Sequence, residues 1–187
     1  MFPWHACLLL HAGLLFFPVS EAGTVRDSDV RYDDGIYSVE MDMEIEVRVE
    51  AVRDIITDYA NMHRVSNLLT ESSLVDAPAE DGIRRRLVSE ICILFFCFES
   101  VIVEDVEEIG RDTVLTTVVP ELSDFHSGRS RWYTQALDND RSLLRFRYDM
   151  EPDFWIPPVI GPLLIKRKLL REAQDTIEMI EALAREE

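Results

Sequence analysis

The chain has 187 residues and is strongly acidic, since 36 Asp and Glu residues against 19 Lys and Arg residues give a net charge of −17 at pH 7. Hydrophobic residues make up 47% of the sequence, which is enough for the core of one folded domain of this length. The acidic balance excludes nucleic acid as a partner, because binding to phosphate groups requires a basic surface.

Residues 1–22 have the features of a secretory signal peptide. An apolar run from Ala6 to Val19 is followed by Ser20-Glu21-Ala22, the small-x-small pattern that precedes a cleavage site. At about 14 residues, the run is shorter than the ~20 residues of a membrane-spanning helix. We therefore expect cleavage after Ala22 and export, to the periplasm or as a secreted protein. No Lys or Arg precedes the apolar run, so an uncleaved N-terminal anchor stays open as the alternative.

Two cysteines remain after the signal peptide, Cys92 and Cys97. An even number of cysteines in an exported chain predicts a disulfide between them, with two reduced buried thiols as the alternative. The pair alone does not make a metal site, because two further ligands at suitable spacing are missing. We expect neither a metal nor a cofactor.

The periodic part of the chain begins after a polar stretch. Residues 23–35 are expected to form a flexible leader, and residues 36–187 the folded domain. From Tyr37 to Val49 apolar and polar residues alternate strictly, which predicts a strand with one buried face and one wet face.

The middle of the chain is predicted to contain two short helices and then strands. Helical spacing of apolar residues indicates a first helix from Glu50 to about Asn61 and a second at about 65–69. Turn residues then separate a brief strand from five longer ones. The predicted strands cover residues 73–77, 83–94, 98–108, 113–119, 129–137 and 142–150. Strands joined by short turns favour an antiparallel meander.

The last third of the chain combines an apolar loop with a long helix. Prolines in the segment 152–162 exclude a helix or a central strand there, yet the segment is rich in aromatic and aliphatic residues. Such a loop requires a ligand cavity, a membrane or a partner to cover it. A stripe of apolar residues at three-to-four spacing predicts a helix from Pro162 to Arg185, long enough to lie across a sheet.

Four segments resemble the START-like, or SRPBCC, superfamily. They are DYANMHRV (58–65), CILFFC (92–97), SDFHSGRSRW (123–132) and PDFWIPPVIGP (152–162). Within this superfamily they are similar to the exported bacterial branch of polyketide cyclase/dehydrase and coenzyme Q-binding START-type proteins, over about residues 36–185. The resemblance implies an α+β helix-grip fold, in which a seven-stranded antiparallel sheet wraps around the C-terminal helix and two small helices follow strand 1.

The resemblance also implies an apolar cavity between the sheet and the last helix. Members of the superfamily bind lipids, quinones, polyketides, sterols or hormones, and a few catalyse cyclisation or dehydration. We therefore expect this chain to bind or transport a hydrophobic small molecule, with plain core packing as the alternative for each residue of the cavity. The candidate cavity and gate residues are Met41, Met43, Ile45, Tyr59, Leu87, Ile91, Trp132, Leu144, Phe146, Tyr148, Phe154, Trp155 and Ile177.

Catalysis is the first competing function. The sequence contains none of the usual hydrolase, metalloprotease or phosphate-binding motifs, which favours binding over an enzyme. A cyclase or dehydratase would draw on Asp58, Tyr59, His126 or Arg131 as polar groups in one cavity. The other arginines, including the run Arg84-Arg85-Arg86, are expected to form exposed ion pairs.

Membrane contact is the second competing function. Two apolar tips, Phe95-Phe96 and Trp155-Ile156, would meet a lipid surface if they lie at the same end of the sheet. The basic cluster Lys166–Arg171 follows the second tip and would add a local attraction to lipid headgroups.

Overall fold

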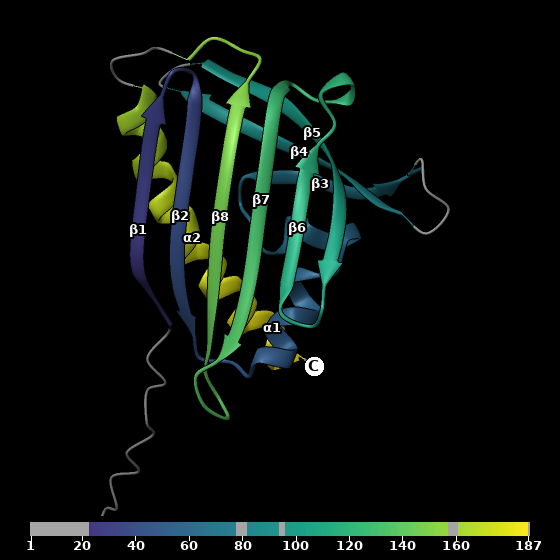
Figure 1. Cartoon of the computed structure of the whole chain (residues 1–187). Helices are drawn as coiled ribbons and strands as arrows, with labels where there is room; N and C mark the ends of the chain where they lie inside the picture. The colour runs from purple at the N-terminus through teal and green to yellow at the C-terminus, as the bar shows by residue number, and fades with distance from the viewer. Residues whose placement is uncertain (1–22, 78–81, 94–95, 157–160, 187) are drawn as a thin grey trace, which may run out of the picture.

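The computed structural model describes residues 23–77, 82–93, 96–156 and 161–186 (Figure 1). The predicted signal peptide and Phe95 lie outside these residues, and the side chains of Ile91 and Phe96 are likewise not described. Within the described residues, an eight-stranded antiparallel sheet curves around a long C-terminal helix. The elements are β1 (Thr24–Asp33), β2 (Ile36–Ile45), α1 (Val49–Ile56), η1 (Tyr59–Arg64), β3 (Leu69–Val75), β4 (Ile83–Ile93), β5 (Phe96–Ile109), β6 (Thr113–Val118), η2 (Pro120–Leu122), β7 (Phe125–Ala136), β8 (Ser142–Pro152) and α2 (Gly161–Glu186).

The strand order in the sheet is β1-β2-β8-β7-β6-β5-β4-β3. The last strand, β8, therefore pairs with β2, and this pairing brings the two ends of the domain together. The architecture is the α+β helix-grip arrangement predicted from the sequence, with eight strands instead of seven. Neither helix of the described residues combines the length and the apolarity that crossing a membrane requires.

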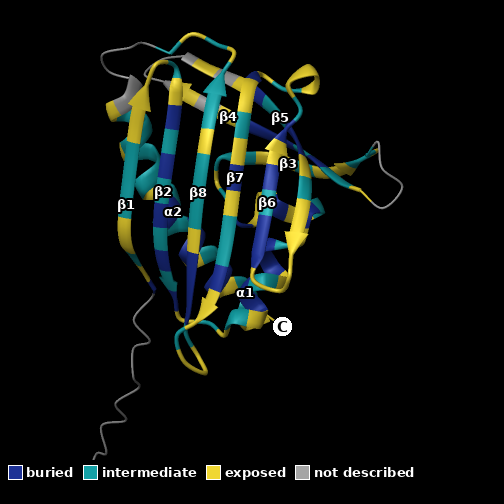
Figure 2. Cartoon of the chain, viewed as in Figure 1, coloured by how far each residue is buried: buried dark blue, intermediate teal, exposed yellow. Residues whose placement is uncertain are grey.

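The alternating strand predicted after the leader is β2. Its inward residues are buried and its outward residues are half-buried, as the alternating colours along β2 show (Figure 2). The strand ends at Ile45, four residues before the predicted end, because the chain turns into α1 at Val49. The buried residues of β2 are Tyr37, Val39, Met41, Met43 and Ile45.

The prediction of a flexible leader is wrong for residues 24–33, which form β1 at the edge of the sheet. Asp34 and Gly35 have φ angles of 46° and 91° and connect β1 to β2, as expected for a two-residue hairpin turn with positive φ at both positions. Val25 and Val30 pack against the core, while charged side chains pair with β2 on the outer face. The strand is polar because it lies at an edge of the sheet.

One α-helix and one 3-10 helix follow β2, which is the second strand and not the first. The predicted second short helix at 65–69 is therefore wrong: η1 ends at Arg64, and Leu69 begins β3. Val65 is buried in the core although it lies outside a helix. An apolar residue at this position is therefore explained by tertiary packing and is not evidence for a helical repeat.

The C-terminal helix α2 has almost the predicted bounds and contacts β1, β2 and α1. Its second half packs against α1 and the nearby ends of the strands, a region that we call the packed end. Five residues there have no exposed surface at all. They are Ile45, Val52, Leu144, Ile177 and Ile180.

Candidate functional site

A cavity of about 280 Å³ lies between the sheet and the first half of α2. Strands β2, β4, β5, β7 and β8 form its sheet side, and η1 and α2 close it from the other side. Most of the wall is apolar. The cavity is a consequence of the fold, because α2 lies close to the sheet at the packed end and the curved sheet leaves space at the other end.

The structure places most of the predicted cavity residues in this wall. They are Met41, Met43, Leu87, Trp132, Phe146, Tyr148 and Phe154. Ile45 and Leu144 of the sheet and Ile177 of α2 instead belong to the buried cluster of the packed end. Tyr59 is buried outside the cavity, and Trp155 is 78% exposed. For Ile91 only the backbone, in β4, is described.

Several wall residues were not predicted from the sequence. Met62 and Val65 come from η1 and the residue after it, Ile165 comes from the first turns of α2, and Ile102 and Met150 come from β5 and β8. Strand alternation could have predicted Ile102 and Met150, since each lies two positions from another inward residue of its strand. The loop and helix residues depend on how η1 and α2 dock, which local periodicity does not reveal.

Three aromatic side chains form a continuous part of the wall on β7 and β8. Trp132 lies directly opposite Phe146 across the two strands, with ring centroids 4.4 Å apart. The next centroid distance, from Phe146 to Tyr148, is 6.0 Å. Both separations are close to the usual range for aromatic pairs, so the three rings pack against one another along the wall.

A buried ion pair interrupts the apolar wall. Arg85 of β4 and Glu104 of β5 are cross-strand neighbours, and each residue is only 3% exposed. Nε and Nη2 of Arg85 donate hydrogen bonds to Oε2 of Glu104 at 2.9 and 2.7 Å. A charged pair this deep is costly to desolvate and is stable only when hydrogen bonds satisfy the remaining atoms.

Neighbouring hydroxyls supply these further hydrogen bonds. The Thr116 hydroxyl donates to Oε1 of Glu104 at 2.8 Å and lies 2.7 Å from the Ser130 hydroxyl. The guanidinium of Arg85 lies over the ring of Tyr59, 5.7 Å from its centroid. We call Arg85, Glu104, Thr116 and Ser130 the polar cluster. Arg85, Glu104 and Ser130 line the cavity.

Two hydrogen-bond donors of the cavity wall have no partner. The hydroxyl of Tyr148 and Nε1 of Trp132 are buried and make no hydrogen bond with any of the residues described. Burial, and then the charge of Glu104, raise the pKa of the Tyr148 hydroxyl well above its usual value. The hydroxyl is therefore a neutral donor at physiological pH. Unpaired buried donors cost free energy, and a ligand acceptor is one way to satisfy them.

The expectation of exposed ion pairs is wrong for the middle residue of the arginine run 84–86. Arg84 and Arg86 are half-buried and pair with the exposed carboxylates of Asp105 and Glu71, whereas Arg85 is buried. Strand alternation is the signal that was available, because it places Arg85 on the same face as the inward residue Leu87.

The four residues expected for a cyclase or dehydratase do not meet in the cavity. Asp58 and Arg131 are exposed, and the exposed His126 places Nε2 2.9 Å from a carboxylate oxygen of Asp153. The Tyr59 hydroxyl donates to Glu108 at 2.9 Å, on the side away from the cavity wall. In the described part of the chain, these residues are separate surface or core features.

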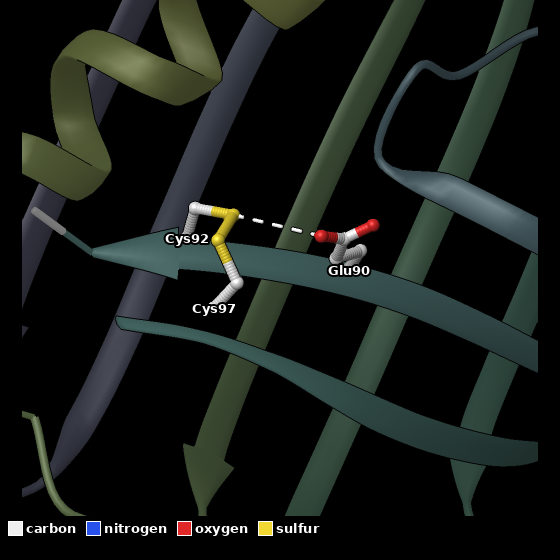
Figure 3. Close-up of side chains that lie close together, drawn as sticks. All are labelled: Glu90, Cys92 and Cys97. Atoms are coloured by element: carbon white, nitrogen blue, oxygen red, sulfur yellow. Dashed lines mark hydrogen bonds between the residues drawn. A yellow bond between two sulfur atoms is a disulfide. The ribbon is translucent and has the colours of Figure 1, made fainter. Parts of the chain in front are cut away.

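Cys92 and Cys97 form a disulfide between the facing ends of β4 and β5 (Figure 3). Sγ of Cys92 lies 3.8 Å from a carboxylate oxygen of Glu90. Because both sulfurs are in the disulfide, this group of three offers no thiolate to a metal ion. The disulfide joins β4 and β5 close to the ends at which the two strands pair.

The ends of β4 and β5 that pair at Ile93 and Phe96 lie at the end of the molecule opposite α1, and so does the start of α2 (Figure 1). There Trp155 and Leu163 are 78% and 53% exposed, and Ile156 is half-buried and lines the cavity. Phe95 of the first predicted tip lies outside the described residues.

No protein-family model and no curated protein sequence matches the chain. Solved structures do match its fold. A START superfamily protein from Mycobacterium smegmatis is 19% identical, with a TM-score of 0.62 over 80% of this chain and 97% of that one. The Zhui aromatase/cyclase from Streptomyces sp. R1128 is 11% identical, with a TM-score of 0.60 over 80% and 94%. A STAR-related lipid transfer protein from Xanthomonas axonopodis is 16% identical, with a TM-score of 0.57 over 84% and 98%. The chain thus has the START-like helix-grip fold.

Proposed function

We propose that this chain binds and carries a hydrophobic small molecule with one oxygen-bearing polar group. The apolar part of the ligand lies along the aromatic wall, and its polar group accepts hydrogen bonds beside the polar cluster. The observation that carries this proposal is the pair of unpartnered buried donors, Tyr148 and Trp132, in a mostly apolar cavity. The fold shared with START-like proteins, one of them a STAR-related lipid transfer protein, supports the same class of ligand.

The energetics favour such a ligand over a pure hydrocarbon. Each CH₂ group buried in the cavity contributes about 0.8 kcal/mol. A carbonyl, hydroxyl or carboxyl oxygen would also satisfy the free donors, whose unpaired burial costs about 1–3 kcal/mol each. A lipid, a quinone or a polyketide-like molecule fits this description.

Ligand discovery is the direct test. The chain, expressed with its leader in an export-competent bacterial host, is examined by native mass spectrometry and its organic extract is identified. Fatty acids, quinones and phospholipids are then screened by thermal shift on delipidated protein. Empty protein together with no thermal shift for any of the three classes contradicts the proposal.

Two variants that each remove one donor test the role of the donors; Tyr148→Phe is close to isosteric, whereas Trp132→Phe also shortens the ring system. Tyr148→Phe and Trp132→Phe each remove a donor from the wall, and we expect each to weaken binding of an oxygen-bearing ligand roughly 10-fold. Binding of a hydrocarbon of the same size is expected to change little. Tyr133→Phe is the matched control, because Tyr133 follows Trp132 on β7 but faces away from the cavity. Equal losses for both ligands would show that the variants act on shape alone.

A cyclase or dehydratase is the competing proposal, and the similarity of fold to the Zhui aromatase/cyclase is one reason to test it. In this chain it would depend on charged and proton-bearing groups that line the cavity, among them Arg85, Glu104 and Tyr148. Incubation of the protein with a linear poly-β-ketone analogue, followed by mass spectrometry, detects loss of water or ring formation. Turnover that Tyr148→Phe abolishes would favour the enzyme over the carrier.

Transient membrane contact is the proposed route for loading the ligand. The exposed Trp155 and Leu163 lie beside the cavity at the start of α2, close in sequence to Lys166, Arg167 and Lys168. Apolar side chains flanked by cations suit a headgroup layer. Trp155→Ala is expected to slow ligand uptake from vesicles that contain anionic lipid while leaving affinity for dissolved ligand unchanged. An unaltered uptake rate would contradict the membrane route.

A further inference from the structure

Glu181 of α2 is a buried carboxylate without a cationic partner. It is 3% exposed and, among the residues that the structure describes, forms no ion pair with an Arg or Lys side chain. Its Oε1 instead accepts two hydrogen bonds from the backbone, from the N–H of Gly23 at 2.8 Å and of Glu46 at 2.9 Å. A buried charge normally requires a counter-ion, and no Arg or Lys side chain among the described residues provides one for Glu181.

The surroundings of Glu181 increase the need for a positive charge. Burial raises the pKa of Glu46, and the charges of Glu44, Glu181 and Asp138 raise it further against the opposing effect of Arg141. Arg141 itself is engaged by Glu44 at 2.7 Å and by Asp138 at 2.7 Å.

The other side chains described around this site do not pair with Glu181 either. Arg26 of β1 pairs with the outer side of β2, at Glu44. On α2, Gln174 donates to the carbonyl oxygen of Gly23 at 3.2 Å, and Glu178 is exposed. No described side chain therefore supplies the cation that Glu181 lacks.

Gly23 occupies a place where only glycine fits. A Cβ atom there would lie 2.2 Å from the carbonyl oxygen of Glu44, 2.8 Å from Oε1 of Glu181 and 2.9 Å from Cγ2 of Ile177. These distances are far below van der Waals contact with atoms that belong to a strand and a packed helix. The nitrogen that approaches Glu181 is thus fixed to this one residue of the chain.

The sequence independently marks the peptide bond before Gly23. Ser20-Glu21-Ala22 is a small-x-small pattern at the end of an apolar segment, and the bond it presents for cleavage is Ala22–Gly23. Hydrolysis of this bond by a signal peptidase consumes one water molecule. It releases the carboxylate of Ala22 with the leader and leaves a protonated amino group on Gly23.

We propose that the α-ammonium group of Gly23, released by cleavage after Ala22, is the counter-ion of Glu181 in the mature protein. Cleavage converts a neutral N–H donor into a cation 2.8 Å from the buried carboxylate, and the carbonyl oxygen of Glu44 lies beside Gly23 as a second acceptor. Cleavage of the leader then adds an ion pair between the residue before β1 and α2. A mature chain that is one residue longer or shorter is expected to lack this pair.

The charge state of the new amino group gives the pair a distinct pH dependence. A free α-amino group has a pKa of about 7.7–8.0, and a carboxylate at hydrogen-bond distance raises that value in the folded state. The stabilisation is therefore complete below about pH 7.7 and is lost as pH rises through the higher folded-state pKa. A chain with an acetylated Gly23 has no such transition.

The test compares two forms of the mature chain, residues 23–187, one with a free amino group on Gly23 and one with that group acetylated. Urea unfolding at pH 7 is expected to give an unfolding constant roughly 10- to 100-fold smaller for the free form, and the difference is expected to shrink towards pH 10. Glu181→Gln keeps an oxygen for the two backbone N–H groups and is expected to weaken the free form without weakening the acetylated one. Glu178→Gln, one turn earlier on the exposed face, is the control and should leave both forms unchanged.

Two results would overturn the proposal. The first is an intact mass of the exported protein that shows a mature N-terminus other than Gly23, or a retained leader. The second is equal stability of the free and acetylated forms at both pH values, or an equal effect of Glu181→Gln on the two.

Discussion

The space between the sheet and α2 is filled in two different ways at its two ends. At the packed end, Ile45, Leu144 and Ile177 have no exposed surface and belong to one buried hydrophobic cluster. At the cavity end, residues of the same strands face about 280 Å³ of space and a buried ion pair. The same alternating strands, β2 and β8, supply both regions.

This difference shows that the inward face of a strand does not by itself decide between core and binding site. Met43 and Ile45 are neighbours on the inward face of β2, yet one lines the cavity and the other packs under α2. We expect the packed end to contribute most of the stability of the fold, so that residues at the cavity end can line an open space without unfolding the domain. Four predictions test this division, in order of expected effect.

The largest effect is expected at the polar cluster. Arg85→Met leaves Glu104 as an unpaired buried charge and is expected to lower the free energy of unfolding by about 3–5 kcal/mol, measured by urea denaturation. The double variant Arg85→Met/Glu104→Leu should recover most of this loss while ligand affinity stays reduced. Arg84→Met, on the neighbouring pair with the exposed Asp105, is the control and should change little. A double variant as unstable as the single one would contradict this account.

The second prediction compares truncations at the two ends. Ile177→Ala creates a new void at the packed end and is expected to cost about 2–5 kcal/mol of unfolding free energy without changing ligand affinity. Leu87→Ala enlarges a cavity that already exists, so fewer contacts are lost and the expected cost is about 1–2 kcal/mol, together with altered affinity. Equal costs and equal effects on binding would remove the distinction between the two ends.

The third prediction concerns alkaline pH. Because the folded state raises the pKa of Tyr148, the stability that its neutral hydroxyl contributes is complete below about pH 10, the ordinary tyrosine pKa, and is lost above it. The fall in unfolding free energy above pH 10 should therefore be less steep in Tyr148→Phe than in the unmodified chain. Tyr133→Phe is the matched control. Identical slopes in Tyr148→Phe and the unmodified chain would show that the hydroxyl is not held in a buried, neutral state.

The smallest effect on stability is expected at the exposed edge of the cavity end. Trp155→Ala should change the free energy of unfolding by less than about 0.5 kcal/mol, because the side chain is 78% exposed. The same variant is expected to slow ligand uptake from vesicles. A destabilisation similar to that of Leu87→Ala would mean that Trp155 packs against the domain in solution.

Local patterns predicted much of the fold and part of the cavity. The alternation in β2, the apolar stripe of α2 and the pairing of Cys92 with Cys97 all follow from short-range spacing. The leader prediction fails because an edge strand tolerates polar residues, and the Asp34-Gly35 turn pairs this polar segment with β2. The burial of Arg85 does not follow from the charge of the arginine run, but strand alternation places Arg85 on the face opposite to that of Arg84 and Arg86.

The sequence by itself determined which side chains face inward, because strand and helix periods are local properties of the backbone. Only the tertiary structure decided which inward residues, such as Ile45 and Met43, pack under α2 or line the cavity, because that choice depends on where the helix meets the curved sheet. It also decided that Arg85 meets Glu104 and that Gly23 meets Glu181, since both contacts join residues far apart in the chain. Buried charges acquire partners through such long-range contacts, and no local period encodes them.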